Sequence, residues 1–217
     1  MYKTVVFDLD GTLLNTLTDL ADAGNRLCRK YGWPTHERQA YRYFVGNGIP
    51  KLVERLAPAD QRTPAVLEAA LADFKRDYGQ HLRDTTAPYP GIPEMLAKLK
   101  ANGVQLAVFS NKADALAKEV VKDYFGTQYF TIVRGQMTGV APKPAAGGTN
   151  ALLKALHADP ASTLYVGDSN VDVETAHNAN LPCCGAVWGF RTREELNAAG
   201  AEYLAENSDE LYDVIMK

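Results

Sequence analysis

The chain has 217 residues, of which 46% are hydrophobic and 23% charged, and its formal net charge is −3. This length suits one large or two modest globular domains, and the slightly acidic balance gives no electrostatic reason to expect binding to nucleic acid or a membrane surface. No apolar run approaches the ~20 residues of a membrane-spanning helix. Three cysteines, two of them adjacent, make no disulfide framework, which favours a location in the reducing cytoplasm.

The first predicted element is a buried strand that ends at two acids. Residues 5–7 are Val-Val-Phe, the composition of a central parallel strand that is covered on both faces. Asp8 and Asp10 follow two positions apart, so on a continuing strand their side chains would point the same way. Gly11 then permits a sharp turn and a close backbone approach to a ligand. The simpler alternative is a strand followed by an acidic turn, because Asp-Gly is common in turns.

Only helices and turns are predicted between residues 15 and 87. Apolar side chains recur at helical spacing in four segments, which are residues 16–32, 36–43, 52–56 and 64–82. The loop FVGNG, residues 44–48, separates the second segment from the third. The Pro/Gly-rich segment TAPYPGIP, residues 86–93, ends this helical block and is predicted to be a linker.

From residue 92 onward, predicted helices alternate with strands. The strands lie over or within residues 104–110, 129–133, 163–167 and 185–189, and the tail from residue 193 adds a helix, a short strand and a last helix. This alternation predicts an α/β fold, a Rossmann-like parallel sheet flanked by helices.

The two halves of this pattern define two predicted domains. Residues 1–14 and 88–217 form the Rossmann-like core, and residues 15–87 form an inserted, all-helical cap domain. Because the insertion begins just after the two acids, it is placed to close over them.

Three later strand ends carry candidate reactive groups. Ser110 ends its strand, and Asn111 and Lys112 are predicted to open a helix whose free amides would bind an anion; a simple helix cap is the alternative. Lys143 stands between two prolines that hold its backbone extended, although an ordinary surface lysine is the alternative. Asp168 follows a buried strand.

A further acid, Asp172, lies four residues after Asp168, so a helix starting at Ser169 would turn both side chains the same way. The alternative is a capping Asp and a solvated one. Because the carboxyl ends of parallel strands meet at one edge of a sheet, all these groups should converge on one crevice. Carboxylates without histidine or thiolate suit Mg²⁺, and a lysine with free amides suits a phosphoryl group.

These motifs, in this order and spacing, resemble the haloacid dehalogenase superfamily of phosphotransferases. The resemblance is carried by DLDGTLL, the strand-terminal Ser110, Lys143 in its Lys-Pro segment, and GDSNVD. The helical block is similar to that superfamily's α-helical cap. The strings PYPGIPEML, VGNG, FSNK and WGF most resemble the phosphoglycolate phosphatase branch.

The resemblance implies a role for each catalytic candidate. Asp8 would be the nucleophile that forms an aspartyl-phosphate, and Asp10 the general acid that becomes the base for water. Ser110 and Lys143 would hold the transferring phosphoryl group. Backbone amides would assist them, namely those near Leu9, Gly11 and Asn111.

The resemblance also implies a metal site and a substrate site. Mg²⁺ would be bound by Asp8, Asp168 and the main-chain carbonyl of Asp10, and Asp172 would either reach the metal through water or orient Lys143. The candidate substrate-binding residues of the cap are Gly46, Asn47, Gly48 and Arg55.

The predicted function is therefore Mg²⁺-dependent hydrolysis of a small phosphomonoester, with 2-phosphoglycolate as the first candidate substrate. The only expected partner is that small molecule, and the chain would be a monomer or a homodimer. The acid at position 10 disfavours the dehalogenases and phosphonatases of the superfamily. A sugar-phosphate mutase, a pyrophosphatase or nucleotidase, and a non-catalytic phosphometabolite-binding protein remain as alternatives.

Overall fold

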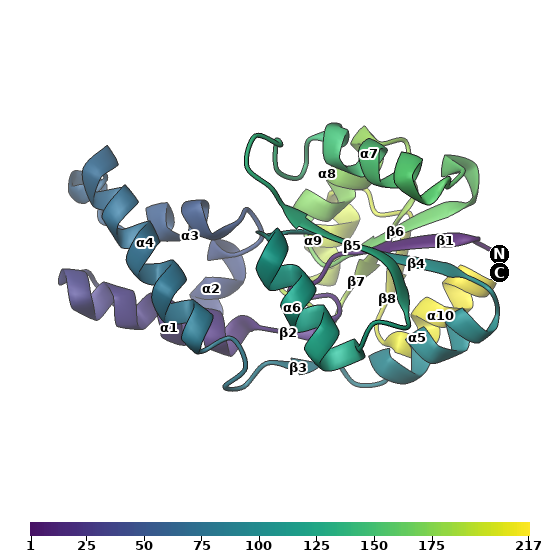
Figure 1. Cartoon of the computed structure of the whole chain (residues 1–217), viewed down its shortest axis with the longest axis horizontal. Helices are drawn as coiled ribbons and strands as arrows, with labels where there is room; N and C mark the ends of the chain where they lie inside the picture. The colour runs from purple at the N-terminus through teal and green to yellow at the C-terminus, as the bar shows by residue number, and fades with distance from the viewer. The chain divides into compact units, whose positions relative to one another are not determined.

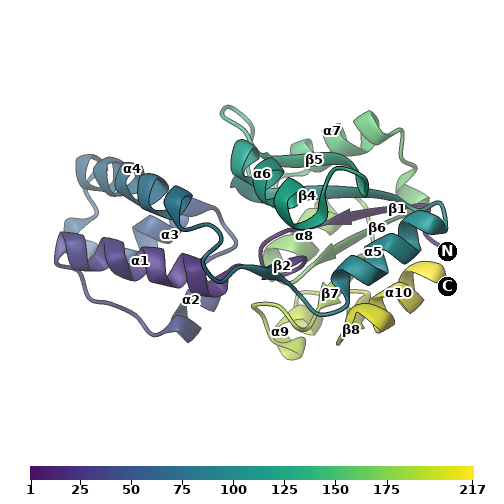
Figure 2. The ribbon, with the colours of Figure 1, turned by 60° about the horizontal axis from the view of Figure 1, so that its bottom comes forward.

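The computed structural model describes residues 1–217. The chain divides into two compact units, which we call the sheet unit (Met1–Asn15 and Pro88–Lys217) and the helical unit (Thr16–Ala87) (Figures 1 and 2). At the two crossings between them, the short strands β2 (Leu14–Asn15) and β3 (Ala87–Pro88) pair with each other. None of the helices combines the length and the apolar character that crossing a membrane requires.

The sheet unit contains one six-stranded sheet in which every neighbouring pair is parallel, in the order β5-β4-β1-β6-β7-β8. The strands are β1 (Thr4–Phe7), β4 (Gln105–Ala113), β5 (Phe130–Gln136), β6 (Thr163–Gly167), β7 (Cys183–Ala186) and β8 (Tyr203–Ala205). The predicted Rossmann-like parallel sheet is therefore confirmed. From β1 the chain builds β4 and β5 on one side and β6 to β8 on the other, which places β1 at the point where the strand order reverses.

Both faces of the central strand are buried, as its all-apolar sequence predicts. Val6 is in register with Ala107 and Tyr165, and these three residues share one core cluster with side chains of α7 and α8. Because side chains alternate along a strand, Val5 and Phe7 face the opposite side of the sheet. β1 is therefore held in place by packing on both of its faces and by hydrogen bonds to β4 and β6 along its two edges.

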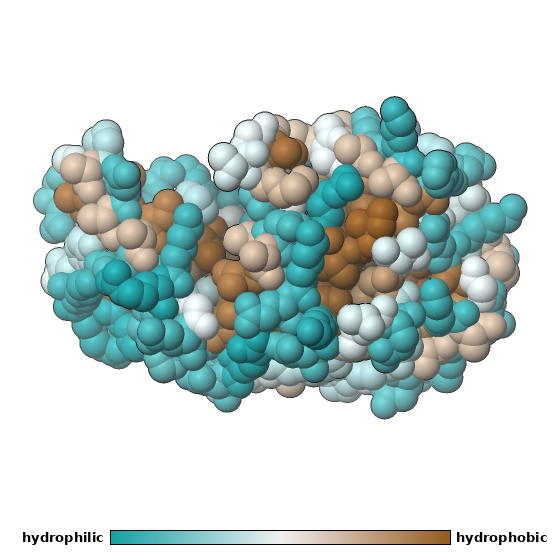
Figure 3. All heavy atoms as spheres, viewed as in Figure 1, coloured by the Kyte–Doolittle hydropathy of each residue, from teal (hydrophilic) through white to brown (hydrophobic).

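Helices cover both faces of this sheet (Figures 1 and 2). On one face α7 packs against α8, and on the other α5 packs against α10. The helices are α5 (Ile92–Ala101), α6 (Asp114–Phe125), α7 (Ala146–Leu156), α8 (Asn170–Asn178), α9 (Arg193–Ala198) and α10 (Ser208–Met216). Gly148 lets α7 approach the sheet, because a Cβ at that position would lie 2.5 Å from the ring of Phe109. The face seen in Figure 3 is mostly hydrophilic, with hydrophobic residues at the surface near the edge strand β5.

Three strands differ from their predicted bounds. β4 continues to Ala113 instead of ending at Ser110, β5 continues to Gln136 instead of ending at residue 133, and β7 spans residues 183–186 and so begins before the segment 185–189 in which it was predicted. The chain stays extended after Ser110 because β5 lies against it: a Cβ on Gly135 would be 2.4 Å from the carbonyl oxygen of Lys112. The two adjacent cysteines pair with β6, and the residues after Ala186 leave the sheet in a turn.

The helical unit contains α1 (Leu17–Tyr31), α2 (Arg38–Phe44), α3 (Ile49–Leu56) and α4 (Pro64–Gln80), with a 3₁₀ turn at Ala59–Gln61. Its core combines aliphatic side chains with three fully buried aromatic ones, Tyr41, Phe74 and Tyr78. Gly24 on α1 makes room for Tyr41, because a Cβ there would lie 2.5 Å from the tyrosine ring. The absence of a side chain at Gly24 therefore lets the ring of Tyr41 on α2 pack directly against α1.

A buried carboxylate joins the first turn of α1 to the last residues of the helical unit. Oδ1 of Asp19 accepts hydrogen bonds from the amide (2.9 Å) and the hydroxyl (2.5 Å) of Thr85. Oδ2 accepts the corresponding bonds from Thr86, at 2.9 and 2.7 Å. The carboxylate of Asp19 thus accepts hydrogen bonds from four donors, the amide and the hydroxyl of each of the two threonines.

We expect Asp19→Asn to lower the free energy of unfolding by about 3 kcal/mol, because the amide group would face two of these donors and hydrogen bonds to a charged group are strong. Urea unfolding followed by circular dichroism measures the change. Asp22→Asn, an exposed acid on the same helix, is the control and should cost less than about 0.5 kcal/mol. Equal stability of the two variants would show that the Asp19 contacts contribute nothing.

Candidate active site

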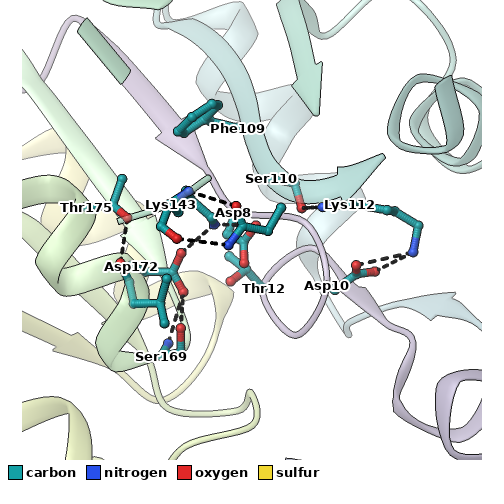
Figure 4. A network of polar contacts seen from close by, with 12 residues as sticks. Asp8, Asp10, Thr12, Phe109, Ser110, Lys112, Lys143, Ser169, Asp172 and Thr175 are labelled. Carbon is teal, nitrogen blue, oxygen red and sulfur yellow. Dashed lines mark hydrogen bonds and ion pairs between the residues drawn. The ribbon is translucent and has the colours of Figure 1, made fainter. Parts of the chain in front are cut away.

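The carboxyl ends of three neighbouring strands bring the candidate residues of the sheet unit together (Figure 4). Asp8 directly follows β1, Asp168 directly follows β6, and Ser110 lies on β4. The residue before Asp8 is in register with residues 108 and 166, so all three side chains stand at the same edge of the sheet. Open α/β sheets bind their ligands at this edge.

Asp8, Asp168 and Asp172 form a cluster of three buried carboxylates, which we call the acidic cluster. Each offers one oxygen atom, and the three atoms lie within 4.8 Å of one another. Asp172 belongs to the first turn of α8, and Asp168 stands two residues before that helix. Hence α8 and the two strand ends together supply the cluster.

Burial and mutual repulsion raise the pKa values in the acidic cluster. Burial is the main cause that raises the pKa of Asp8 to about 7, and the charge of Asp172 adds to it while Lys143 opposes it. Burial also raises the pKa of Asp168 well above its usual range, with further contributions from Asp172 and Asp8. Like charges held this close without water favour a proton or a cation among them.

Three glycines line the acidic cluster and allow it to be this compact. A Cβ on Gly11 would lie 2.3 Å from Oδ2 of Asp168, and one on Gly189 would lie 2.2 Å from Cβ of Asp168. A Cβ on Gly167 would lie 2.2 Å from Cβ of Asp172. Gly11 also has φ +90°, a conformation that favours glycine. Any side chain at these positions would displace the carboxylates.

Hydrogen bonds hold two members of the acidic cluster in place. Asp168 accepts from the amide of Phe190 at 2.7 Å and from the hydroxyl of Thr12 at 3.1 Å. Asp172 accepts from the amide and the hydroxyl of Ser169, at 3.1 and 2.6 Å. These donors fix the orientation of both carboxylates before any ligand binds.

One oxygen of the acidic cluster is incompletely satisfied. Oδ1 of Asp8 is buried, receives no well-directed hydrogen bond, and is contacted by Nζ of Lys143 at 2.8 Å as an ion pair. A buried carboxylate oxygen with unused hydrogen-bonding capacity is costly. The oxygen-only donor set of the cluster fits a hard divalent cation, which would satisfy this atom.

Lys143, on the segment between β5 and α7, is buried within the site and is not a surface lysine. Its Nζ lies 2.7 Å from Oδ1 of Asp172, 2.8 Å from Oδ1 of Asp8 and 3.3 Å from the hydroxyl of Tyr165. Burial alone would lower the pKa of Lys143, but Asp172 and Asp8 raise it well above its usual value. The lysine is therefore a permanent cation that partly neutralises the acidic cluster.

The backbone of Lys143 is held by the side chain of Asn111. The amide of Lys143 donates to Oδ1 of Asn111 at 2.8 Å, and Nδ2 of Asn111 donates to the carbonyl of Lys143 at 3.3 Å. This reciprocal pair joins β4 to the segment that carries the lysine. The side chain of Asn111 is thus engaged with Lys143, and a contribution of its backbone amide to substrate binding stays a prediction.

Asp10 lies outside the acidic cluster and pairs with a second lysine. Nζ of Lys112 lies 3.0 and 3.2 Å from the two carboxylate oxygens of Asp10. Figure 4 shows this pair to one side of the group formed by Asp8, Lys143 and Asp172. Asp8 and Asp10, two positions apart in the sequence, therefore have different cationic partners, Lys143 and Lys112.

The prediction that Asn111 and Lys112 open a helix is wrong. Both residues belong to β4, and α6 begins at Asp114. Asp114 is fixed against β5, since its Oδ1 accepts from the amide of Gly135 at 2.9 Å. Ser110 is buried at the strand edge, and its hydroxyl accepts from the amide of Lys112 at 3.2 Å.

Sequence reasoning assigned no role to Lys112, Tyr165 or Thr12, all of which the structure brings to the site. For Lys112 the local signal was incomplete: residues two apart on a strand share a face, so its side chain would have been placed beside that of Ser110 only if β4 were known to continue past Ser110. For Tyr165 the signal was weaker: a buried tyrosine hydroxyl needs a hydrogen-bond partner, but the neighbouring sequence does not indicate which residue that partner is.

The four candidate substrate-binding residues of the helical unit lie on one loop and the helix after it. The guanidinium of Arg55 donates to the carbonyls of Tyr43 and Phe44, at 3.1 and 2.8 Å, and to Oδ1 of Asn47 at 2.8 Å. Gly46 and Gly48 have φ of +105° and +82°. Arg55 thus stabilises the turn that these glycines make possible.

Carboxylates, a buried lysine and a hydroxyl gathered at the carboxyl edge of a parallel sheet supply groups of the kind that phosphoryl-transfer sites use. The profile of the haloacid dehalogenase-like hydrolases matches residues 5–186. The chain belongs to this family, and the predicted membership is confirmed.

The relatives of the chain are phosphatases. It is 32% identical to the phosphoglycolate phosphatase of Thiobacillus denitrificans over 197 residues, which cover 87% of this chain and 84% of that protein. It is 31% identical to the phosphoglycolate phosphatase of Chromobacterium violaceum over 216 residues, 98% and 96% of the two chains. The crystal structure of a proposed phosphoglycolate phosphatase from Lactobacillus delbrueckii superposes with a TM-score of 0.93 at 28% identity, covering 99% of this chain and 98% of that one. The prediction that the chain is a phosphatase is thereby confirmed.

Proposed function

We propose that the chain is a Mg²⁺-dependent phosphatase that hydrolyses 2-phosphoglycolate through an aspartyl-phosphate. The observation that carries the proposal is the buried oxygen of Asp8, which receives no well-directed hydrogen bond and lies 2.8 Å from Nζ of Lys143 within the acidic cluster. The names of the two relatives support the choice of substrate. A location in the cytoplasm stays a prediction.

In the first step, an oxygen of Asp8 attacks phosphorus and the bond from phosphorus to the substrate oxygen breaks. Asp10 gives its proton to that leaving oxygen. In the second step, Asp10 takes a proton from water, whose oxygen attacks phosphorus and releases Asp8. Two easier displacements thus replace one difficult hydrolysis.

Lys143 and Ser110 hold the phosphoryl group during both displacements. The cation of Lys143 offsets the repulsion between a carboxylate nucleophile and a phosphate dianion. Asp8, Asp168 and the carbonyl of Asp10 would hold Mg²⁺, which supplies further positive charge when bound. Of the two predicted roles for Asp172, the 2.7 Å contact with Nζ of Lys143 supports the orientation of the lysine.

Residues 15–87 act in this proposal as the cap that selects the substrate. The contacts of Arg55 with the carbonyl of Phe44 and the side chain of Asn47 support a role for Arg55 in shaping the turn at residues 46–48. The specificity of the enzyme would then reside in the helical unit and the chemistry in the sheet unit.

We expect the purified protein to hydrolyse 2-phosphoglycolate with a higher kcat/KM than pyrophosphate, sugar phosphates or nucleotides, and EDTA to abolish turnover. Added Mg²⁺ should raise the melting temperature by several degrees, because a ligand at about 100 times its Kd stabilises by about 2.7 kcal/mol. Asp168→Asn should lose this thermal shift. Turnover in EDTA would contradict the metal-dependent mechanism, and isomerisation of a sugar phosphate would identify a mutase instead.

A further inference from the structure

The site holds a second buried lysine that the mechanism above does not use. The side chain of Lys112 is 2% exposed, and both oxygens of Asp10 lie within 3.2 Å of its Nζ. Removing an ammonium group from water is costly unless a counter-ion compensates. The pairing with Asp10 is thus a feature of the folded site, not a chance contact of a flexible surface chain.

The backbone of Lys112 is fixed at the point where β4 leaves the sheet. Its amide donates to the hydroxyl of Ser110 at 3.2 Å. Its carbonyl oxygen faces Gly135 of β5, where a Cβ would be only 2.4 Å away. Both contacts lie within the sheet, so strand packing sets the backbone position of Lys112, and the ion pair with Asp10 holds its ammonium group.

The two lysines divide the four carboxylates of the site into two groups. Lys143 contacts two members of the acidic cluster, Asp8 and Asp172, and Lys112 contacts Asp10. Figure 4 shows the carboxylate of Asp10 directed toward Lys112 and not toward Asp8. The pairing with Lys112 thus accompanies the separation of the Asp10 carboxylate from the acidic cluster.

We propose that Lys112 is a positioning residue that holds the Asp10 carboxylate apart from the acidic cluster, on the leaving-group side of the site. This inference rests on the proposed function, in which Asp10 gives a proton to the leaving oxygen and later takes one from water. Lys112 itself gains and loses no proton. It restricts the Asp10 side chain to the place where both transfers occur, and geometry of this kind is worth large factors in rate.

The experiment compares Lys112→Met with Lys112→Arg in the full chain with Mg²⁺. On 2-phosphoglycolate we expect Lys112→Met to lower kcat about 100-fold with less than about a threefold change in KM, because general acid–base catalysis contributes 10²–10⁴-fold. Lys112→Arg should restore kcat to within about tenfold of the parent, because arginine also pairs with a carboxylate. Circular dichroism and melting temperature report folding.

A second substrate separates positioning from a general structural defect. p-Nitrophenyl phosphate has a leaving group that needs no proton, so its first step should stay fast in Lys112→Met while water attack slows. We therefore expect a burst of about one equivalent of nitrophenolate and then slow turnover, as for any accumulating covalent intermediate. A structural defect would slow both steps and give no burst.

Lys118→Met is the control, because Lys118 is exposed on α6 and pairs with Asp114; it should behave as the parent does. Parent-like kcat in Lys112→Met would overturn the proposal while leaving the phosphatase function intact. A rise in KM confined to esters that carry a carboxylate would also overturn it, since Lys112 would then bind the substrate. Unchanged kinetics in Asp10→Asn would remove the role of Asp10 and the proposal with it. Absence of any turnover by the parent enzyme would instead reject the proposed function.

Discussion

Asp8→Asn should lower kcat on any phosphomonoester by about 10⁴-fold or more, because the amide cannot form the acyl phosphate and other groups do not replace a lost nucleophile. The fold should survive. The buried acidic cluster contains three carboxylates against one lysine, so neutralising Asp8 removes repulsion at a group whose pKa burial already raises to about 7. We therefore expect the melting temperature in EDTA to be unchanged or higher than that of the parent.

Steady-state kinetics and differential scanning fluorimetry measure the two parts of this prediction. Asp209→Asn, an exposed acid at the start of α10, is the matched control and should change neither quantity. Retained turnover in Asp8→Asn would assign the nucleophile to another residue. A large loss of melting temperature would show that the contact between Asp8 and Lys143 stabilises the fold more than the repulsion among the acids destabilises it.

Lys143→Met should abolish turnover and also destabilise the sheet unit. The substitution leaves Asp8 and Asp172 buried without their cation, and breaking a buried ion pair from one side costs about 3–5 kcal/mol. Lys154→Met, on the exposed face of α7, should cost less than about 0.5 kcal/mol. Urea unfolding in EDTA measures both variants, and equal stability would contradict the ion-pair account.

The loss of stability caused by Lys143→Met should grow as the pH rises. The pKa of Asp8 is raised to about 7 in the folded chain even with the lysine present, and removing Lys143 raises it further. The folded state then binds more protons than the unfolded state above the ordinary aspartate pKa of about 3.9, so the free energy of unfolding falls as pH rises from there through the folded pKa. We expect the variant to be closest to the parent in stability near pH 5, and a difference that grows toward acid would contradict this.

Most of the sheet could be predicted from the sequence because its signals are local. The apolar run before Asp8 and the run before Asp168 each predict a buried strand ending at an acid, and both are found. The end of β4 could not be predicted in the same way. Its extension to Ala113 depends on the backbone of β5 at Gly135, a residue whose proximity no local pattern reports.

The sequence by itself determined which reactive groups stand at strand ends and in what order, because residue type and periodicity decide burial and strand direction locally. Only the tertiary structure decided which carboxylate meets which lysine. Asp10 and Lys112 are 102 residues apart, and Thr12 and Asp168 are 156 apart. Such pairs form where packed strands and close-approaching glycines bring their backbones together. The division of Asp8 and Asp10 between two lysines is therefore a property of the folded sheet, since side chains two residues apart carry no local signal that separates them.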